Sequence, residues 1–277
     1  VQFPESVTFG NYEADDFDRV LSFFDWSLKD KKVEFDFRLG NTYSEVFACL
    51  MFAHQRFLIA NNCKIKILFP NDTLSWEVIK KSSEDWDTLL NLEKDWSKEK
   101  MRPLLVYNSE DREKAINFAE KYFEKLDTEY VKTLRYVLNE ILYNTLEHGR
   151  NGSDIPSLLQ FFCDEEKMEL SFVVADVGVG IRKHLHQTYP NLATDSEAIL
   201  LSIKPQISGT FGRPNTGYET KNNAGVGLFF SSNIAQRLNA DMFIVSGNGF
   251  VHISPTEIIS KELNHQWKGT FVYVKIT

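Results

Sequence analysis

One stretch of the sequence places an acid and an amide at helical spacing. Glu140, Asn144 and Glu147 follow one another at i, i+4 and i+7, which puts their side chains on one face of a helix. A carboxylate and an amide oxygen one turn apart can hold an attacking water and a magnesium ion in register, because hard divalent ions take oxygen ligands. The same pattern is typical of a solvent-facing helix surface, so alone it leaves both interpretations open.

A second group follows an apolar run that predicts a strand. Asp176, Gly178 and Gly180 form a D-x-G-x-G pattern. The glycines would let the backbone turn sharply and allow a flat ring to approach, while Asp176 could accept a hydrogen bond from an exocyclic amine such as that of adenine. A strand-ending turn with a solvent-facing Asp is the alternative. A Rossmann site is excluded, since no third glycine follows and the surrounding unit is a hairpin.

The third group opens a predicted helix. It consists of four consecutive residues, Gly225, Val226, Gly227 and Leu228. Bare amides at a glycine-rich helix start form an anion site that the helix dipole favours, so phosphates can bind there. A flexible hinge before a core helix explains the pattern equally well.

Together these groups resemble the GHKL family of ATP-binding domains, which includes sensor histidine kinases, anti-sigma serine kinases, type II topoisomerases, mismatch-repair ATPases and chaperone ATPases. Residues 139–149 look like its N box, residues 176–180 like its first glycine box and residues 225–228 like its second. The family's closing motif is matched by Gly269, Thr270 and Phe271. The resemblance covers about residues 108–277.

The resemblance implies an α+β fold, a Bergerat-type sandwich with helices on one face of a mixed sheet. It implies that Glu140 is the general base or water-orienting carboxylate, that Asn144 is the Mg²⁺ ligand and that Asp176 is the adenine partner. The other residues that it places around the nucleotide are Gly178, Gly180, Gly225, Val226, Gly227, Leu228 and Thr270. Residues 182–224 would form the ATP lid, in which Lys221 or Arg213 could neutralise the γ-phosphate.

The function implied by this resemblance is a Mg²⁺-dependent ATPase or serine/threonine-type protein kinase in bacterial regulation. The alternative is a binding module in which ATP controls a protein partner with little chemistry. A sensor histidine kinase is a third interpretation. It lacks a phosphoacceptor motif, because His54 is the one upstream candidate and is better explained as a structural histidine.

The elements that must position these residues follow from hydrophobic periodicity. Turning each residue by 100° places four side chains of the helix at 128–148 on a core-facing stripe, namely Leu134, Leu138, Ile141 and Thr145. The other elements predicted after residue 108 are a helix at 110–126, a hairpin of 157–163 and 169–175, helices at 195–203 and 227–238, and strands at 242–246, 250–253 and 270–276. A capping box from Thr194 to Glu197 opens the third helix.

The first part of the chain alternates strand and helix signals. Strands at 33–37 and 65–69 flank a helix that a capping box from Thr42 would open, which implies a parallel pair. A further strand is predicted at 104–107. The pattern is similar to a STAS domain, and Thr42 or Ser44 lies near the phosphosite of that fold, although an N-cap already explains Thr42. The predicted domains are therefore residues 1–107 and 108–277.

Composition narrows the function classes. The 277 residues carry a net charge of −8, and an acidic surface repels the phosphate backbone, so nucleic acid is not the expected partner. No run of residues suits a membrane span, and the three scattered cysteines fit reduced thiols of a cytoplasmic protein. The expected ligands are ATP or ADP with Mg²⁺, and the expected partner is a regulatory protein; a homodimer stays open.

Overall fold

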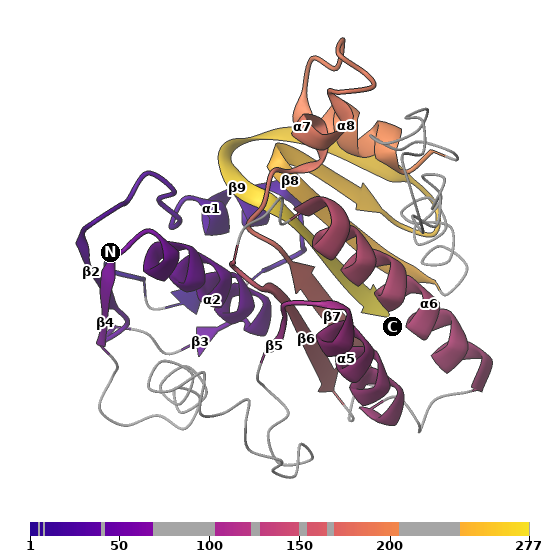
Figure 1. The fold of residues 1–277 in the computed structure, drawn as a ribbon, viewed down its shortest axis with the longest axis horizontal. Helices are drawn as coiled ribbons and strands as arrows, with labels where there is room; N and C mark the ends of the chain where they lie inside the picture. The colour runs from indigo at the N-terminus through magenta and orange to yellow at the C-terminus, as the bar shows by residue number, and fades with distance from the viewer. Residues whose placement is uncertain are drawn as a thin grey trace.

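The computed structural model describes residues 1–4, 6–7, 9–39, 42–68, 103–122, 128–149, 154–164, 169–204 and 239–276 (Figure 1). The predicted helix at 227–238 lies outside these ranges, as do the four residues of the second glycine box. Within the described ranges, no helix is both long and apolar enough to cross a membrane.

The centre of the molecule is a sheet whose five described strands lie in the order β5, β6, β7, β9, β8. Their bounds are Leu104–Val106 (β5), Ser157–Asp164 (β6), Glu169–Ala175 (β7), Ala240–Ile253 (β8) and Ile258–Ile276 (β9). Every neighbouring pair is antiparallel, so the mixed sheet expected from the sequence is wrong for these strands. The direct hairpins β6–β7 and β8–β9 can only pair antiparallel, and the long-range pairings of β5 with β6 and of β7 with β9 are antiparallel as well.

Two predictions about the strands needed correction or extension. The strands expected at 242–246 and 250–253 are one strand, β8, and the strand expected at 270–276 already begins at Ile258. Gly247 and Gly249, between the two expected strands, lie at register shifts inside the continuous hairpin. The strand expected at 104–107, just before the predicted domain boundary, pairs with β6 at the edge of the large sheet.

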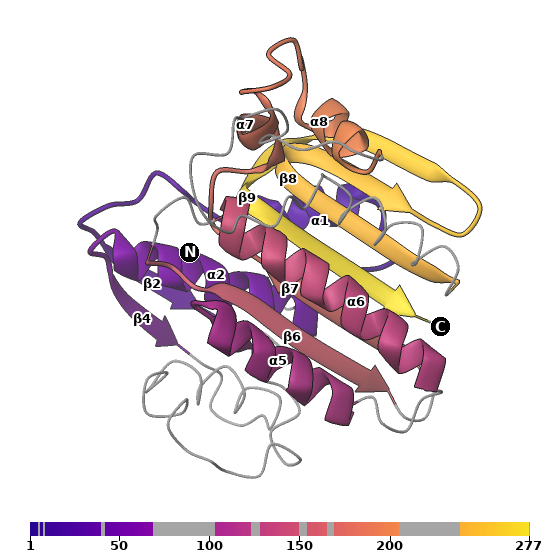
Figure 2. The same cartoon turned by 45° about the vertical axis from the view of Figure 1, so that its right-hand side comes forward.

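Two helices cover one face of the sheet, α5 (Ser109–Tyr122) and α6 (Thr128–Asn144), and Figure 2 shows both in front of it. The predicted core stripe of α6 is confirmed, because Leu134, Leu138, Ile141 and Thr145 are all buried. The helix does not run on to residue 148 as an α-helix. After Asn144 it widens into a π-helical turn, η3 (Thr145–Gly149).

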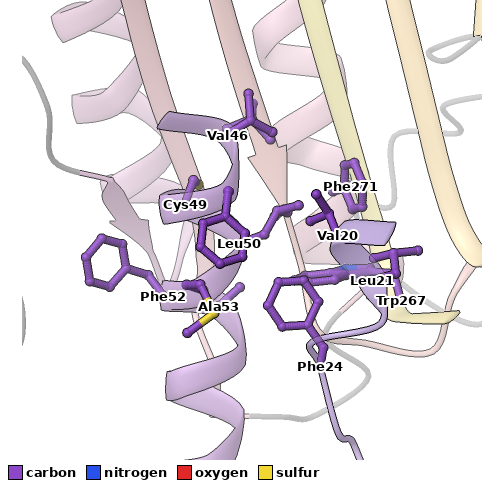
Figure 3. Close-up of a cluster of buried hydrophobic side chains, with 14 of the residues drawn as sticks. Val20, Leu21, Phe24, Val46, Cys49, Leu50, Phe52, Ala53, Trp267 and Phe271 are labelled. Carbon is purple, nitrogen blue, oxygen red and sulfur yellow. The ribbon is translucent and has the colours of Figure 1, made fainter. Parts of the chain in front are cut away.

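The first part of the chain covers the opposite face of the sheet. Its elements are β1 (Ser6–Val7), α1 (Ala14–Leu21), β2 (Lys32–Asp36), β3 (Thr42–Tyr43), α2 (Glu45–Ala60) and β4 (Lys64–Leu68). Figure 3 shows side chains from α1 and α2 packed with Trp267 and Phe271 of β9. One buried cluster joins this N-terminal layer, residues 1–68, to the sheet. The α+β sandwich expected for the C-terminal part is confirmed, since its helices α5, α6 and α8 (Asp195–Ser202) pack on one face of the sheet, and the N-terminal layer covers the other face.

The predicted strand, helix, strand unit is confirmed, since β2 and β4 pair in parallel on either side of α2. The predicted N-cap is wrong. Thr42 belongs to β3, and Ser44 opens α2 by accepting a hydrogen bond from the Phe47 backbone N–H at 3.1 Å. A serine immediately before the helix competes better for this position than a threonine three residues away. The likeness to a STAS domain stays a prediction.

Two interpretations of single side chains are confirmed in the N-terminal layer. Cys49 and Cys63 are buried free thiols. His54 is 1% exposed, its Nε2 lies 3.0 Å from the carbonyl of Asp25, and burial lowers its pKa to about 4. It is a neutral structural histidine.

We expect Phe17→Ala to lower the free energy of unfolding by about 3–5 kcal/mol, because the ring contacts Phe243, Phe250 and Phe271 from the sheet. Urea unfolding followed by far- and near-UV circular dichroism should show one transition, shifted as a whole. Ile59→Ala, at an exposed position, should change the free energy of unfolding by less than about 0.5 kcal/mol. Two transitions of which only one moves would contradict a shared core.

Candidate functional site

Asp176 is a buried carboxyl at the end of β7, with 3% of its surface exposed. Its Oδ1 accepts hydrogen bonds from the backbone N–H groups of Gly178 at 2.9 Å and Thr270 at 3.3 Å. Its own backbone N–H donates to the carbonyl of Thr270 at 2.8 Å. The D-x-G-x-G turn and the closing motif, which are 94 residues apart, therefore fix one carboxyl together.

A bulge in β9 makes this contact possible. Ser246 of β8 pairs with Thr270, but the next residue, Gly247, pairs with Trp267, so residues 268–269 of β9 bulge out of the ladder. Gly269 has a φ of +105°, and a Cβ there would lie 2.5 Å from the backbone oxygen of Asp176. Only glycine fits at this position. The sequence flagged Gly269 as part of a motif but not this close approach.

The glycine turn after Asp176 is held by Ser246, a site residue that the sequence reasoning missed. The backbone N–H of Ile181 donates to Ser246 Oγ at 2.8 Å, and this hydroxyl donates to the carbonyl of Gly269 at 3.0 Å. Gly180 has a φ of +76°, and a Cβ there would lie 3.1 Å from Ser246 Oγ. A polar residue on the buried side of an apolar strand was the available signal.

Burial controls the charge of the site. Desolvation raises the pKa of Asp176 from its ordinary 3.8 to about 7, although the hydrogen bonds from Gly178 and Thr270 favour the ionised form. The carboxyl therefore changes charge near neutral pH. Such a displaced pKa in a structured turn is typical of a binding site.

The N-box side chains lie on the last turns of α6. Glu140 and Asn144 are both half-buried, and Glu147 on η3 is exposed. Burial raises the pKa of Glu140, and the positive charge of Arg112 partly offsets that rise. The Arg112 guanidinium lies 5.6 Å from the ring centroid of Tyr143, which anchors it beside this helix face.

The fold brings the two groups to one end of the sheet. Figure 2 shows the C-terminal end of α6 over the end at which β7 finishes, and η3, which continues α6, contacts β9. Asn144 closes the helix and Asp176 follows β7, so the predicted magnesium ligand and the predicted adenine partner share this end. Gly225, Val226, Gly227 and Leu228, like Arg213 and Lys221, lie outside the described residues.

The first part of the predicted lid is docked on the sheet. It contains α7 (Ile181–Leu185) and α8 (Asp195–Ser202), and the predicted capping box of α8 is confirmed. Asp195 Oδ2 accepts from the backbone N–H of Asn248 at 3.1 Å, and the backbone N–H of Ser196 donates to Glu262 at 2.7 Å. These bonds tie α8 to the β8–β9 hairpin, next to the bulge.

Asn144 is the predicted magnesium ligand at this site, and one side chain cannot fill the coordination shell of a metal ion. Among the described residues, no three His, Cys, Asp or Glu side chains come together as a metal site. Asn144 can offer one amide oxygen, and magnesium commonly completes its shell with phosphate and water oxygens. The residues therefore fit a magnesium ion that arrives with a nucleotide.

A family model described as the histidine kinase-like ATPase domain matches residues 108–248, just over half of the chain. The chain belongs to this family. The GHKL-type ATP-binding domain expected from the sequence is thereby confirmed, and Glu140, Asn144 and Asp176 all lie inside the matched part of this histidine kinase-like ATPase. Thr270, which also contacts Asp176, lies beyond it.

Among solved structures, the chain is similar to the histidine kinase domain of the blue-light activated histidine kinase EL346 from Erythrobacter litoralis. The two are 12% identical, and the match covers 83% of this chain and 85% of that one, with a TM-score of 0.29. No curated protein matches the chain.

We expect Asp176→Asn to flatten the pH dependence of stability. With a pKa of about 7 folded against 3.8 ordinarily, the folded state keeps a proton that the unfolded state loses, so stability falls as pH rises from about 4 to about 7. A tenfold difference in proton affinity between the two states corresponds to roughly 1.4 kcal/mol. Urea unfolding across this range measures the slope. Asp154→Asn, at an exposed residue, should keep the slope of the parent. If Asp176→Asn also kept the slope of the parent, the raised pKa of Asp176 would be refuted.

We expect Gly269→Ala to lower the free energy of unfolding by at least about 2 kcal/mol, because it combines a strained φ with a clash against Asp176. Gly10→Ala is the matched control, since the nearest atom to its Cβ would be Asp16 Oδ2 at 3.7 Å, an ordinary contact. Thermal unfolding distinguishes them. Equal stability of the two variants would show that the bulge tolerates a side chain.

Proposed function

We propose that the chain binds ATP with Mg²⁺ and cleaves the γ-phosphate, either by hydrolysis or by transfer to a serine or threonine of a partner protein. The observation that carries this proposal is the buried carboxyl of Asp176, fixed at the end of the sheet over which α6 ends with Asn144. Membership of the histidine kinase-like ATPase family supports it.

Asp176 suits adenine because its Oδ1 is already held by two backbone donors, which aligns the carboxyl before any ligand arrives. The exocyclic amine of adenine would donate to this carboxyl. The turn at Gly178 and Gly180 would leave room for the ring, and the second glycine box at 225–228 would cover the phosphates.

Asn144 would hold magnesium through its side-chain oxygen, and the ion would neutralise phosphate charge when bound. Glu140 would accept the proton of the attacking water or hydroxyl as the new oxygen–phosphorus bond forms. The bond from the γ-phosphorus to the bridging oxygen breaks, and ADP leaves with that electron pair. The raised pKa of Glu140 makes it a stronger base than an exposed glutamate.

A second function, an ATP-dependent switch with little catalysis, is favoured by one observation. Trp267 of β9 donates a hydrogen bond to the Asp176 carbonyl and also packs against the N-terminal layer. The N-terminal layer could therefore sense nucleotide binding without any chemistry. A regulatory protein partner belongs to both versions of the proposal. The proposal also includes a cytoplasmic location and leaves a homodimer open.

Glu140→Gln separates the two functions. It keeps the size and hydrogen-bonding reach of the side chain and removes the base, so we expect ADP formation to fall by about 100-fold or more. ATP affinity should stay within about twofold, because the adenine and magnesium ligands are intact. ADP formation, which hydrolysis and transfer both produce, and calorimetric ATP binding are measured on the same samples.

Glu110→Gln is the matched control, since Glu110 is exposed on α5 and pairs with Lys114 at 2.8 Å. It should behave as the parent does. ATP binding without ADP formation in the parent would reject the enzyme and leave the switch. Absence of ATP binding in the parent would reject both.

A further inference from the structure

Trp267 lies where the site meets the N-terminal layer. It is 1% exposed, and its Nε1–H donates to the backbone carbonyl of Asp176 at 2.8 Å. This bond fixes the main chain of the residue whose side chain is assigned to adenine. A buried carbonyl without its donor would carry an unsatisfied acceptor, so the bond constrains where Asp176 can lie.

The other side of the indole is built by the N-terminal layer. Phe24 and Trp26 meet it edge-on, with ring centroids 5.5 and 4.9 Å away. Trp26 also donates its Nε1–H to the carbonyl of Gln266, next to Trp267 in β9, at 2.9 Å. Figure 3 shows Phe24 and Trp267 side by side. The indole is therefore packed between the N-terminal layer and the residues around Asp176.

Neighbouring residues of β9 dock on the same layer. Asp18 of α1 accepts from the Asn264 side chain at 2.7 Å and from the His265 backbone N–H at 2.8 Å. The Lys268 ammonium lies 4.4 Å from the ring centroid of Phe57 on α2. The segment 264–268 thus contacts the N-terminal layer at several points and leads directly into the bulge.

Strand pairing holds the segment 264–268 only at Trp267, so the segment can contact both the N-terminal layer and the turn at Asp176. Gly249 of β8 pairs with Glu262 and Gly247 pairs with Trp267, so residues 263–266 of β9 lie opposite the single residue Asn248. Residues 268–269 bulge out next to them. Because this part of β9 is only loosely tied to β8, its position depends on what packs against it.

We propose that Trp267 is a positioning residue for adenine recognition and that it makes this recognition depend on the docked N-terminal layer. This inference rests on the proposed function, because it concerns how Asp176 is presented to the adenine amine. The N-terminal layer would then influence which nucleotide binds through the Trp267 indole, without contacting the nucleotide itself.

The test compares ATP with inosine triphosphate, which carries an oxygen in place of the adenine amine. In the parent, Asp176 should favour ATP. Trp267→Phe keeps an aromatic ring and removes the donor to the Asp176 carbonyl. We expect the ratio of the two dissociation constants, measured by calorimetry, to fall about 3- to 10-fold toward equality, as one hydrogen bond predicts.

Trp26→Phe tests the dependence on the N-terminal layer. It removes the donor to Gln266 while leaving the Trp267 bond in place, so the ratio should fall in the same direction by a smaller factor. Tyr12→Phe is the matched control. It removes a hydroxyl contact of 3.4 Å to Tyr273 between the same two layers, away from Asp176, and should leave the ratio unchanged.

The outcomes separate the inference from the function on which it rests. If Trp267→Phe weakens both nucleotides equally, the residue is merely structural and the inference is overturned. If Trp26→Phe gives the same ratio of dissociation constants as Tyr12→Phe, the dependence on the N-terminal layer is overturned. Should Trp267→Phe fail to fold, this comparison between Trp26→Phe and Tyr12→Phe decides the inference. If the parent binds neither nucleotide, the proposed function itself is overturned. If the parent binds ATP more tightly than inosine triphosphate, the proposed function stands whatever the variants show.

Discussion

The contact between Asp176 and the bulge of β9 is the constraint on which the site depends. A carboxyl this deeply buried loses much of its hydration, and the backbone donors of Gly178 and Thr270 offset part of that cost. Both donors reach it only because Gly269 has no side chain and adopts a left-handed conformation. The position of the Asp176 carboxyl, the proposed partner of adenine, is thus a property of strand pairing.

The two faces of the sheet contribute different parts of this arrangement. On one face, α6 brings Glu140 and Asn144 to the end of the sheet where β7 finishes. On the other face, the N-terminal layer packs on β9 through a single hydrophobic cluster. Because β9 borders both, the residues that precede the ATPase domain are part of the environment of its site. The proposed nucleotide site therefore shares β9 with a second layer of the same chain.

Local patterns allowed much of this to be predicted. The core stripe of α6, the β6–β7 hairpin and the capping box at Thr194 each depend on residues a few positions apart, and all are confirmed. Asp176 was found in the same way, from a short motif at a strand end. Such signals need no knowledge of which distant segments meet.

The errors concern pairings between distant segments or choices between adjacent residues. Nothing in the sequence near Trp267 shows that its indole bonds to a carbonyl 91 residues earlier, or that β9 bulges there. The antiparallel pairings of β5 with β6 and of β7 with β9 likewise depend on long-range packing. At the start of α2, two nearby hydroxyls competed, and Ser44 rather than Thr42 caps the helix.

A structure of the full chain with a non-hydrolysable ATP analogue and Mg²⁺ is the most direct measurement of the central claim. The account predicts the adenine amine within hydrogen-bond distance of the Asp176 carboxyl and the side-chain oxygen of Asn144 on the metal. An adenine bound elsewhere, or stacked at this end of the sheet with its amine turned away from Asp176, would contradict it.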